Sequence, residues 1–190
     1  MTVEKTPLQD CLLLKPRVMK DDRGSFFESY NHREFQKATG LEIDFVQDNQ
    51  SSSKKGALRG LHLQLGKMAQ AKLVRVIQGE ILDVVVDVRK NSPSFGKTYR
   101  VVLSGENNHQ LFIPRGFAHG FVTLSETAIF AYKCDNYYDK AAESGIIFND
   151  EVLNIDWNYP LDQVILSEKD AVLPDFEEFL RRQESFESKN

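Results

Sequence analysis

The sequence predicts an all-β protein built from two packed antiparallel sheets. Eight strand-like segments follow one another between residues 44 and 134, and no connection between them has the length or periodicity of a helix. Glycine, asparagine, serine and proline form turn signals between most of these segments. A parallel α/β fold needs crossover helices, so the pattern instead favours a sandwich, a barrel or a jelly roll.

The first 40 residues are expected to form two strands and one helix. Pro16 lacks the N–H that a sheet needs, so the first strand is expected at an edge, where it could pair with a second copy of the chain. Asn31 can cap the helix and Gly40 can end it. The expected elements, in order, are a strand over 12–18, a turn over 21–24, a strand over 26–30 and a helix over 31–39.

The middle of the chain supplies most of the strands. Residues 81–88 are almost all apolar or β-branched, which predicts a central, deeply buried strand. Beyond residue 135 the pattern is irregular until a final amphipathic helix over 175–182. Residues 183–190 are polar and expected to fray, and residues 1–190 are expected to form a single domain. The expected strands are 44–50, 57–64, 71–77, 81–88, 98–103, 110–113, 120–124 and 128–134.

Composition excludes several classes of protein. Hydrophobic residues make up 41% and charged residues 27% of the chain, which is ordinary for a globular protein. A net charge of -4 argues against a nucleic-acid binder that relies on bulk charge. The two cysteines, Cys11 and Cys134, form no disulfide framework, which favours a cytoplasmic location. The N-terminus lacks the layout of a signal peptide, and no apolar run approaches the ~20 residues that span a bilayer.

Residues 57–64 contain the first candidate site. Apolar and polar residues alternate toward the end of this segment, which places His62 and Gln64 on one face of a strand. Gly60 weakens a strand interior, so it suggests close approach by a ligand or by another backbone. With Arg59, these side chains would make a polar floor for an anionic ligand; the alternative is an edge strand whose polar face is in water.

The spacing of His62 and Gln64 resembles the metal motif of the cupins, in which His-x-His precedes a glutamate and a glycine. Lys72 stands near the glutamate position before Gly79, and residues 114–119 match the second motif, Pro-x-Gly-x-x-His. Glutamine and lysine therefore replace two expected ligands. An ammonium group has no lone pair, and two histidines alone make a poor zinc or iron site. The pocket is expected to hold no metal and to suit anionic or carbonyl-bearing ligands.

A set of short sequence blocks extends this pattern across the chain. The blocks are 22–28 (Asp-Arg-Gly-Ser-Phe-Phe-Glu), 47–49, 58–62, 72–79, 113–121, 132–133, 137–138 and 167–170 (Ser-Glu-Lys-Asp). In this order they resemble the dTDP-4-dehydrorhamnose 3,5-epimerases, from about residue 7 to residue 181. The resemblance implies a cupin-like jelly roll that forms a homodimer and uses no metal or cofactor. It also implies a dTDP-4-keto-6-deoxy sugar as substrate, in the third step of dTDP-L-rhamnose synthesis.

The resemblance also implies a role for individual residues. The reaction removes protons from C3 and C5, beside the C4 ketone, so it needs a base, an acid on the other sugar face and stabilisation of an enolate. His62 matches the base, Asp170 the carboxylate that orients it, Tyr132 the acid and Lys72 the cation near O4. Further positions match substrate contacts: Arg23, Arg59 and His119 for the pyrophosphate and sugar, Tyr138 for stacking on thymine, and Glu28, Gln47, Asn49, Glu143 and Lys169 for other contacts.

Three alternatives remain open from the sequence. An epimerase that acts only at C3 or at C5 would share the base and the acid. A non-catalytic nucleotide-sugar-binding cupin would not need both His62 and Tyr132. A metal-dependent cupin oxygenase conflicts with Gln64 and Lys72. Taken one at a time, His62, His119, Lys72 and Tyr132 also fit ordinary structural roles.

Overall fold

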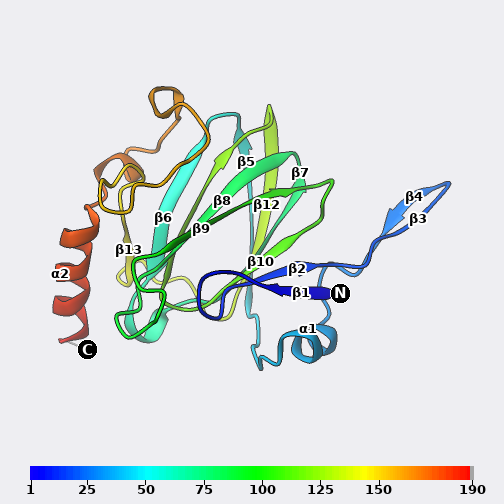
Figure 1. The fold of residues 1–190 in the computed structure, drawn as a ribbon, viewed down its shortest axis with the longest axis horizontal. Coiled ribbons are helices and arrows are strands. Elements are labelled where there is room, and N and C mark those ends of the chain that lie inside the picture. The colour runs from blue at the N-terminus through cyan, green and yellow to red at the C-terminus, as the bar shows by residue number, and fades with distance from the viewer. Residues whose placement is uncertain (189–190) are drawn as a thin grey trace.

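A computed structural model describes residues 1–188, and its two main sheets are antiparallel and pack face to face (Figure 1). This confirms the predicted fold class. All eight central strands are present, one of them (110–113) with the predicted ends and the others with one or both ends shifted. The first sheet has the order β1 (Thr2–Lys5), β2 (Leu12–Lys15), β10 (Gln110–Ile113), β7 (Lys72–Gln78), β12 (Thr127–Cys134), β5 (Gln47–Lys54). The second has the order β13 (Glu143–Gly145), β6 (Leu58–Gln64), β11 (Phe117–Thr123), β8 (Glu80–Asp87), β9 (Thr98–Ser104).

Two α-helices and three short 3-10 helices complete the described part of the chain. Helix α1 (His32–Thr39) begins at Asn31, whose side chain accepts backbone N–H groups, and ends at Gly40 in the left-handed conformation, as predicted. Helix α2 (Phe176–Glu187) begins after Asp175, which caps it. The 3-10 helices are η1 (Gly66–Met68), η2 (Leu161–Gln163) and η3 (Asp170–Val172). No helix among residues 1–188 is long and apolar enough to cross a membrane.

Apolar side chains form three packed layers. The interior between the sheets contains Val74 and Phe130 from one sheet and Val85 from the other. Segment 146–186 covers the outer face of the five-stranded sheet, and Phe179 in this segment is fully buried. Burial of such a side chain stabilises the fold by about 1.5–3 kcal/mol. Helix α1 covers part of the outer face of the six-stranded sheet through Phe35 and its neighbours.

Strand β8 is covered on both faces, which confirms the prediction of a deeply buried strand over 81–88. Leu82, Val84 and Val86 face the outer layer, whereas Ile81 and Val85 face the interior between the sheets. The same alternation turns two carboxylates, Asp83 and Asp87, toward the interior side, and neither is accessible to solvent.

Three expectations about the ends of the chain are wrong. Strand β2 is not an edge, because it ends before Pro16 and pairs with β10 on one side and with the unpredicted edge strand β1 on the other. The strand expected over 26–30 is only the end of β4 (Gly24–Phe26). Residues 183–187 are helical rather than frayed, because α2 lies against the outer layer, where Phe186 packs. Residues 189–190 lie outside the described residues.

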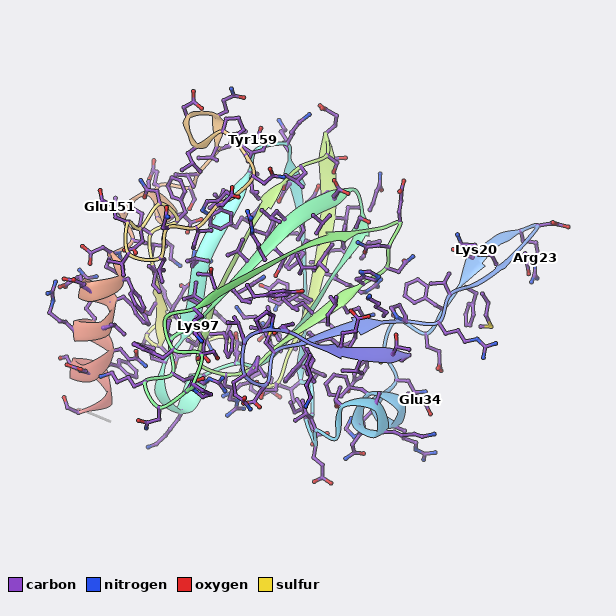
Figure 2. The ribbon with its side chains drawn as sticks, viewed as in Figure 1. Lys20, Arg23, Glu34, Lys97, Glu151 and Tyr159 are labelled. Carbon is purple, nitrogen blue, oxygen red and sulfur yellow. The ribbon has the colours of Figure 1, made fainter. Side chains whose placement is uncertain are left out.

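Strands β3 (Met19–Asp21) and β4 form a hairpin that projects from the body of the molecule, which we call the arm (Figure 1). Figure 2 shows Lys20 and Arg23 on this arm, far from both main sheets. Met19 and Phe26 are partners across the hairpin and are 49% and 64% exposed. Such exposure of large apolar side chains on a free hairpin is typical of a surface that binds another protein.

Candidate active site

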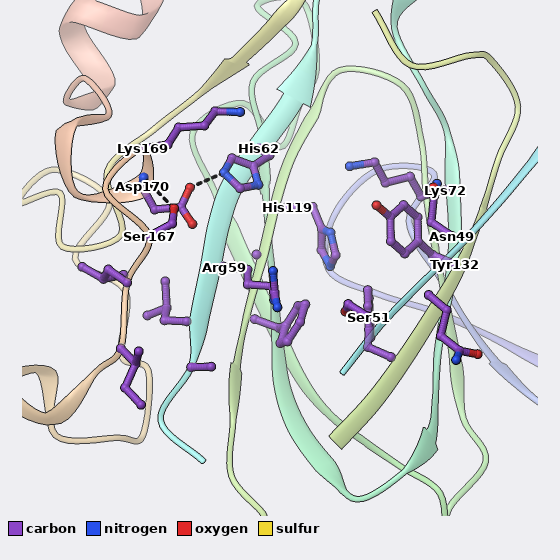
Figure 3. A pocket seen from close by; sticks show the side chains of 18 residues that line it. Asn49, Ser51, Arg59, His62, Lys72, His119, Tyr132, Ser167, Lys169 and Asp170 are labelled. Carbon is purple, nitrogen blue, oxygen red and sulfur yellow. Dashed lines mark hydrogen bonds and ion pairs between the residues drawn. The ribbon is translucent and has the colours of Figure 1, made fainter. Parts of the chain in front are cut away.

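A cavity of about 490 Å³ lies between the two main sheets and is closed on one side by the loop before α2 (Figure 3). Strands β6 and β11 of the five-stranded sheet form one wall, and β5, β7 and β12 of the six-stranded sheet form the other. Eight of the residues expected in the site line this cavity: Asn49, Arg59, His62, Lys72, His119, Tyr132, Lys169 and Asp170.

Strand register explains why these side chains meet. His62 on β6 is the register partner of His119 on β11, so the two histidines lie side by side on one wall. On the other wall, Tyr132 pairs with Asn49 of β5. Lys72 stands at the start of β7, next to β12. The structure therefore brings together residues from five strands of two different sheets.

Glycines allow the two strands of the histidine wall to approach closely. A Cβ on Gly60, whose φ is +107°, would lie 2.5 Å from the carbonyl oxygen of His119. A Cβ on Gly120 would lie 2.6 Å from the carbonyl oxygen of Arg59. The sequence predicted close approach at Gly60, and the neighbour is the backbone of β11. A register shift between His119 and Phe121 accompanies this contact.

His62 forms the first histidine–carboxylate pair. Its Nε2 lies 2.5 Å from Oδ1 of Asp170, a residue 108 positions later in the chain. The imidazole side chain is 29% exposed, whereas the carboxylate is 5% exposed. A carboxylate accepts the Nε2–H of a neutral imidazole, which leaves the lone pair on Nδ1. His62 thus has the geometry of an oriented general base.

Asp170 is held in its ionised form. Burial raises the pKa of this carboxyl, but hydrogen bonds from His62, Ser167 and the Gly60 backbone outweigh burial, so its pKa is lowered. A carboxylate that stays charged stabilises an imidazolium beside it. The His62–Asp170 pair is therefore suited to accept a proton from a bound molecule.

His119 forms a second pair, with Asp83 of β8. Its Nε2 lies 2.8 Å from Oδ2 of Asp83, and the two side chains are 7% and 0% exposed. Burial raises the pKa of Asp83, while His119 and Lys72 oppose that rise. Oδ1 of Asp83 has no hydrogen-bond partner among residues 1–188. Asp83 was missed from the sequence, although a charged residue within the apolar run 81–88 is a signal for a buried polar contact.

Lys72 and Tyr132 face the histidines from the opposite wall (Figure 3). Nζ of Lys72 lies 5.8 Å from the centre of the Tyr132 ring and makes no hydrogen bond or ion pair with any described residue. Burial lowers the pKa of Lys72, and nearby acidic groups, Cys134, Asp83 and Glu143, oppose that change. Burial raises the pKa of Tyr132, which keeps its phenol protonated. The wall thus offers a cation and a proton donor.

Three more expected residues, Gln47, Tyr138 and Glu143, join Lys169 and Asn49 in a hydrogen-bonded rim beside the cavity. Lys169 makes an ion pair with Glu143, and the Tyr138 hydroxyl donates to the same carboxylate at 2.9 Å. The Tyr138 backbone N–H donates to Gln47, whose side chain donates to Asn49 at 3.2 Å. This chain of contacts joins the loop before α2 to strand β5 across the cavity mouth.

Three other residues from the sequence analysis, Arg23, Glu28 and Gln64, belong neither to the cavity lining nor to its rim. Arg23 and Glu28 belong to the arm and to its connection with α1, and neither is among the residues that line it. Gln64, expected beside His62 on a polar floor, is only 6% exposed and binds backbone groups of Met68, Tyr137 and Asp139. Gln64 therefore holds the loop after β12 rather than a ligand.

The donor groups around the cavity are engaged with other partners or protonated. Within residues 1–188 there is no group of three or more His, Cys, Asp or Glu side chains that could hold a metal ion. Nε2 of His62 and Nε2 of His119 are both engaged with carboxylates. Both cysteines are free and buried, and burial raises the pKa of Cys134 to about 11, so its thiol is protonated.

Comparison with known proteins gives matches over most of the chain. Residues 5–178 match the family model described as dTDP-4-dehydrorhamnose 3,5-epimerase. The Salmonella typhimurium (strain LT2) dTDP-4-dehydrorhamnose 3,5-epimerase is 55% identical over 175 residues, which is 92% of this chain and 94% of that protein. The crystal structure of the Elizabethkingia anophelis enzyme of the same name has 56% identity and a TM-score of 0.90, covering 94% and 97% of the two chains.

A further solved structure contains a ligand. It is the dTDP-6-deoxy-D-glucose-3,5-epimerase from Legionella pneumophila Philadelphia 1 in complex with dTDP-4-keto-L-rhamnose. Its sequence identity with this chain is 45%, its TM-score is 0.89, and the match covers 93% of each chain. These similarities extend over nearly the whole sandwich and the cavity within it.

Proposed function

Because this chain belongs to the dTDP-4-dehydrorhamnose 3,5-epimerase family, we propose that it is an epimerase acting on dTDP-4-dehydro-6-deoxy-D-glucose to give dTDP-4-dehydro-L-rhamnose. One observation carries the assignment of roles. An oriented imidazole, His62, and a protonated phenol, Tyr132, face one cavity from opposite walls. Inversion at carbon needs a proton removed from one face and returned to the other.

The first step would be removal of the C3 or C5 proton by His62. Both hydrogens are acidified by the C4 ketone, and the electron pair of the broken C–H bond moves into an enolate. Asp170 accepts the Nε2–H of His62 and stabilises the imidazolium that forms. A positioned base of this kind contributes about 10²–10⁴-fold to the rate.

Lys72 would stabilise the enolate. Its ammonium faces the cavity from the wall opposite His62 and has no competing partner among residues 1–188. A preorganised cation beside developing charge in a partly dry site costs no reorganisation during the reaction. The Lys72 ammonium is therefore suited to stabilise the negative charge that develops on O4 of the sugar.

Tyr132 would return the proton from the opposite face. Its raised pKa favours the protonated phenol at neutral pH, as an acid requires. After transfer, the phenolate would lie beside Lys72 and near Arg59, whose charge lowers the Tyr132 pKa. Exchange of both groups with water then restores the pair for the second centre.

The remaining cavity residues would bind the nucleotide and sugar. Arg59 is exposed at the mouth and, with His119, would contact the pyrophosphate and sugar. The Tyr138 ring, 55% exposed, would stack on thymine. Gln47, Asn49, Glu143 and Lys169 would supply the other contacts from the rim.

Arg23 and Glu28 fit this function only in a homodimer. They lie on the projecting arm and beside it, outside the cavity of their own chain. An arm that binds a second copy would bury Met19 and Phe26 and would carry Arg23 toward the partner's bound nucleotide. We also place the enzyme in the cytoplasm, in keeping with its two free cysteines.

The direct test is incubation with dTDP-4-keto-6-deoxyglucose in heavy water, with deuterium located by NMR. Deuterium at both C3 and C5, with inversion at both, is expected. Deuterium and inversion at a single carbon would instead identify a mono-epimerase. Binding of the nucleotide sugar without any exchange would identify a non-catalytic protein.

A further inference from the structure

The loop that carries Asp170 is fixed at both of its ends. We call residues 165–174 the strap. At its start, Ile165 N–H donates to Gly56 O at 2.8 Å, and Leu58 N–H donates to Ile165 O at 3.0 Å. At its end, Ile147 N–H donates to Pro174 O at 2.8 Å. Between these anchors the strap has no strand pairing, so Asp170 is held by its own turn together with contacts from His62 and from the Gly60 backbone.

Ser167 organises that turn. The Asp170 N–H donates to Ser167 Oγ at 3.1 Å, and the Ala171 N–H donates to Ser167 O at 3.1 Å (Figure 3). In this local serine turn the hydroxyl accepts a backbone N–H three residues later in the chain, at the first residue of the short η3. Ser167 is itself exposed, so the hydroxyl packs little apolar surface.

We propose that Ser167 is a positioning residue that fixes Asp170 against His62, an inference that rests on the proposed epimerase function. The hydroxyl holds the backbone of Asp170, and the carboxylate then meets Nε2 of His62 at 2.5 Å. Loss of the Oγ contact leaves the Asp170 N–H without this acceptor and loosens the turn, although the Ala171 N–H still donates to Ser167 O. A carboxylate displaced by a fraction of an ångström stabilises the imidazolium less well.

The surroundings of Asp170 support the same role. Burial raises the pKa of Asp170, and a hydrogen bond from Ser167 is one of the contacts that lower it. The other charged or titratable groups that face this region are His62 on β6, Glu143 on β13 and Lys169 on the strap. Lys169 and Glu143 form an ion pair with each other, so His62 is the charged partner of Asp170.

The test is Ser167→Ala, compared with Ser104→Ala as a matched control. Ser104 makes the same turn contacts: its Oγ accepts the Asn107 N–H at 3.0 Å and its O accepts the Asn108 N–H at 3.0 Å, in the turn between β9 and β10. Ser167→Ala should lower kcat about tenfold, the effect of one hydrogen bond, with KM within about twofold of wild type. Ser104→Ala should leave kcat unchanged.

Two further variants separate positioning from other roles. Ser167→Thr keeps the hydroxyl and should restore most of the lost kcat. In an Asp170→Asn background, Ser167→Ala should cost nothing more, because the serine acts through the carboxylate.

A rise in KM at unchanged kcat, or additive losses with Asp170→Asn, would overturn the proposal. A Ser167→Ala variant with the kcat of the wild type would also overturn the positioning role of Ser167, but it would not affect the proposed epimerase function. The proposed function fails separately, if the wild-type enzyme exchanges no deuterium into the substrate.

Discussion

Two histidine–carboxylate pairs lie side by side on strands β6 and β11, and they differ in how far solvent reaches them. His62 is 29% exposed and its carboxylate comes from the strap, whereas His119 is 7% exposed and its carboxylate, Asp83, comes from the adjacent strand β8. The distances between nitrogen and oxygen are similar, at 2.5 and 2.8 Å. The pKa of Asp170 is nevertheless lowered, while that of Asp83 is raised.

The difference lies in the other donors around each carboxylate. Asp170 receives contacts from Ser167 and from the Gly60 backbone in addition to its histidine. One oxygen of Asp83 has no partner within residues 1–188, and its side chain is fully buried. The same two residue types therefore give one pair whose carboxylate stays charged beside an accessible imidazole, and one pair locked within the wall. Environment, rather than residue type, assigns the base.

Replacing each histidine in turn should give the largest difference between the two pairs. His62→Ala should abolish proton removal, so solvent deuterium should enter neither C3 nor C5, a loss of at least about 10²–10⁴-fold. His119→Ala should retain exchange and chiefly raise KM, because its imidazole is engaged by Asp83. NMR of the substrate in heavy water measures both. If His119→Ala abolishes exchange while His62→Ala retains it, the two roles are reversed.

Tyr132→Phe tests whether Tyr132, on the wall opposite the two histidine–carboxylate pairs, is the acid. The variant keeps the ring and His62 but loses the phenol proton. Exchange at C3 and C5 should continue, because His62 can return a deuteron to the face from which it took the proton. Inversion should fall by about 10²–10⁴-fold. Normal inversion by this variant would remove Tyr132 from the mechanism.

Replacement of Asp170 should lower kcat more than replacement of Asp83, just as replacement of His62 should cost more than replacement of His119. Asp170→Asn should lower kcat by about 10²-fold or more, since the imidazolium loses its neighbouring charge. Asp83→Asn retains an oxygen that can accept from His119 and should lower kcat by less than about tenfold. Steady-state kinetics on the two purified variants measures both losses of kcat. Equal losses would mean that both pairs serve the chemistry alike.

Some of this arrangement was predictable from the sequence, and the physical reasons are specific. Alternation and turn residues identified the eight central strands. They did not show that His62 and His119 would lie in one sheet and face Lys72 and Tyr132 from the other. The short strands β1, β3 and β13 were missed, because their pairing depends on partners rather than on their own pattern. The contact between His62 and Asp170 spans 108 positions, so only the family resemblance pointed to it.

Asp170 and Asp83 should also differ in how they affect the stability of the fold as the pH changes. The lowered pKa of Asp170 means that its contribution to the free energy of unfolding is present above the unfolded value of about 3.9 and is lost as pH falls below it. The raised pKa of Asp83 has the opposite sign, so its contribution is lost as pH rises through its folded value.

Asp170→Asn should therefore be less stable than wild type at pH 7, by about 1–3 kcal/mol, with the difference narrowing toward pH 3. Asp83→Asn should be at least as stable as wild type at pH 7. Urea unfolding at several pH values measures both differences. Two variants with the same pH dependence would show that the carboxylates do not differ in this way.

Removal of metal ions should have the smallest effect, namely none. The Nε2 atoms of both cavity histidines bind carboxylates, and the nearby Lys72 ammonium repels a divalent cation and offers no lone pair. Exhaustive dialysis against a chelator should leave kcat unchanged, and elemental analysis should find no stoichiometric zinc, iron or manganese. If activity disappears and one of these metals restores it, the metal-free roles of His62 as base and of Lys72 as the cation beside O4 would both be wrong.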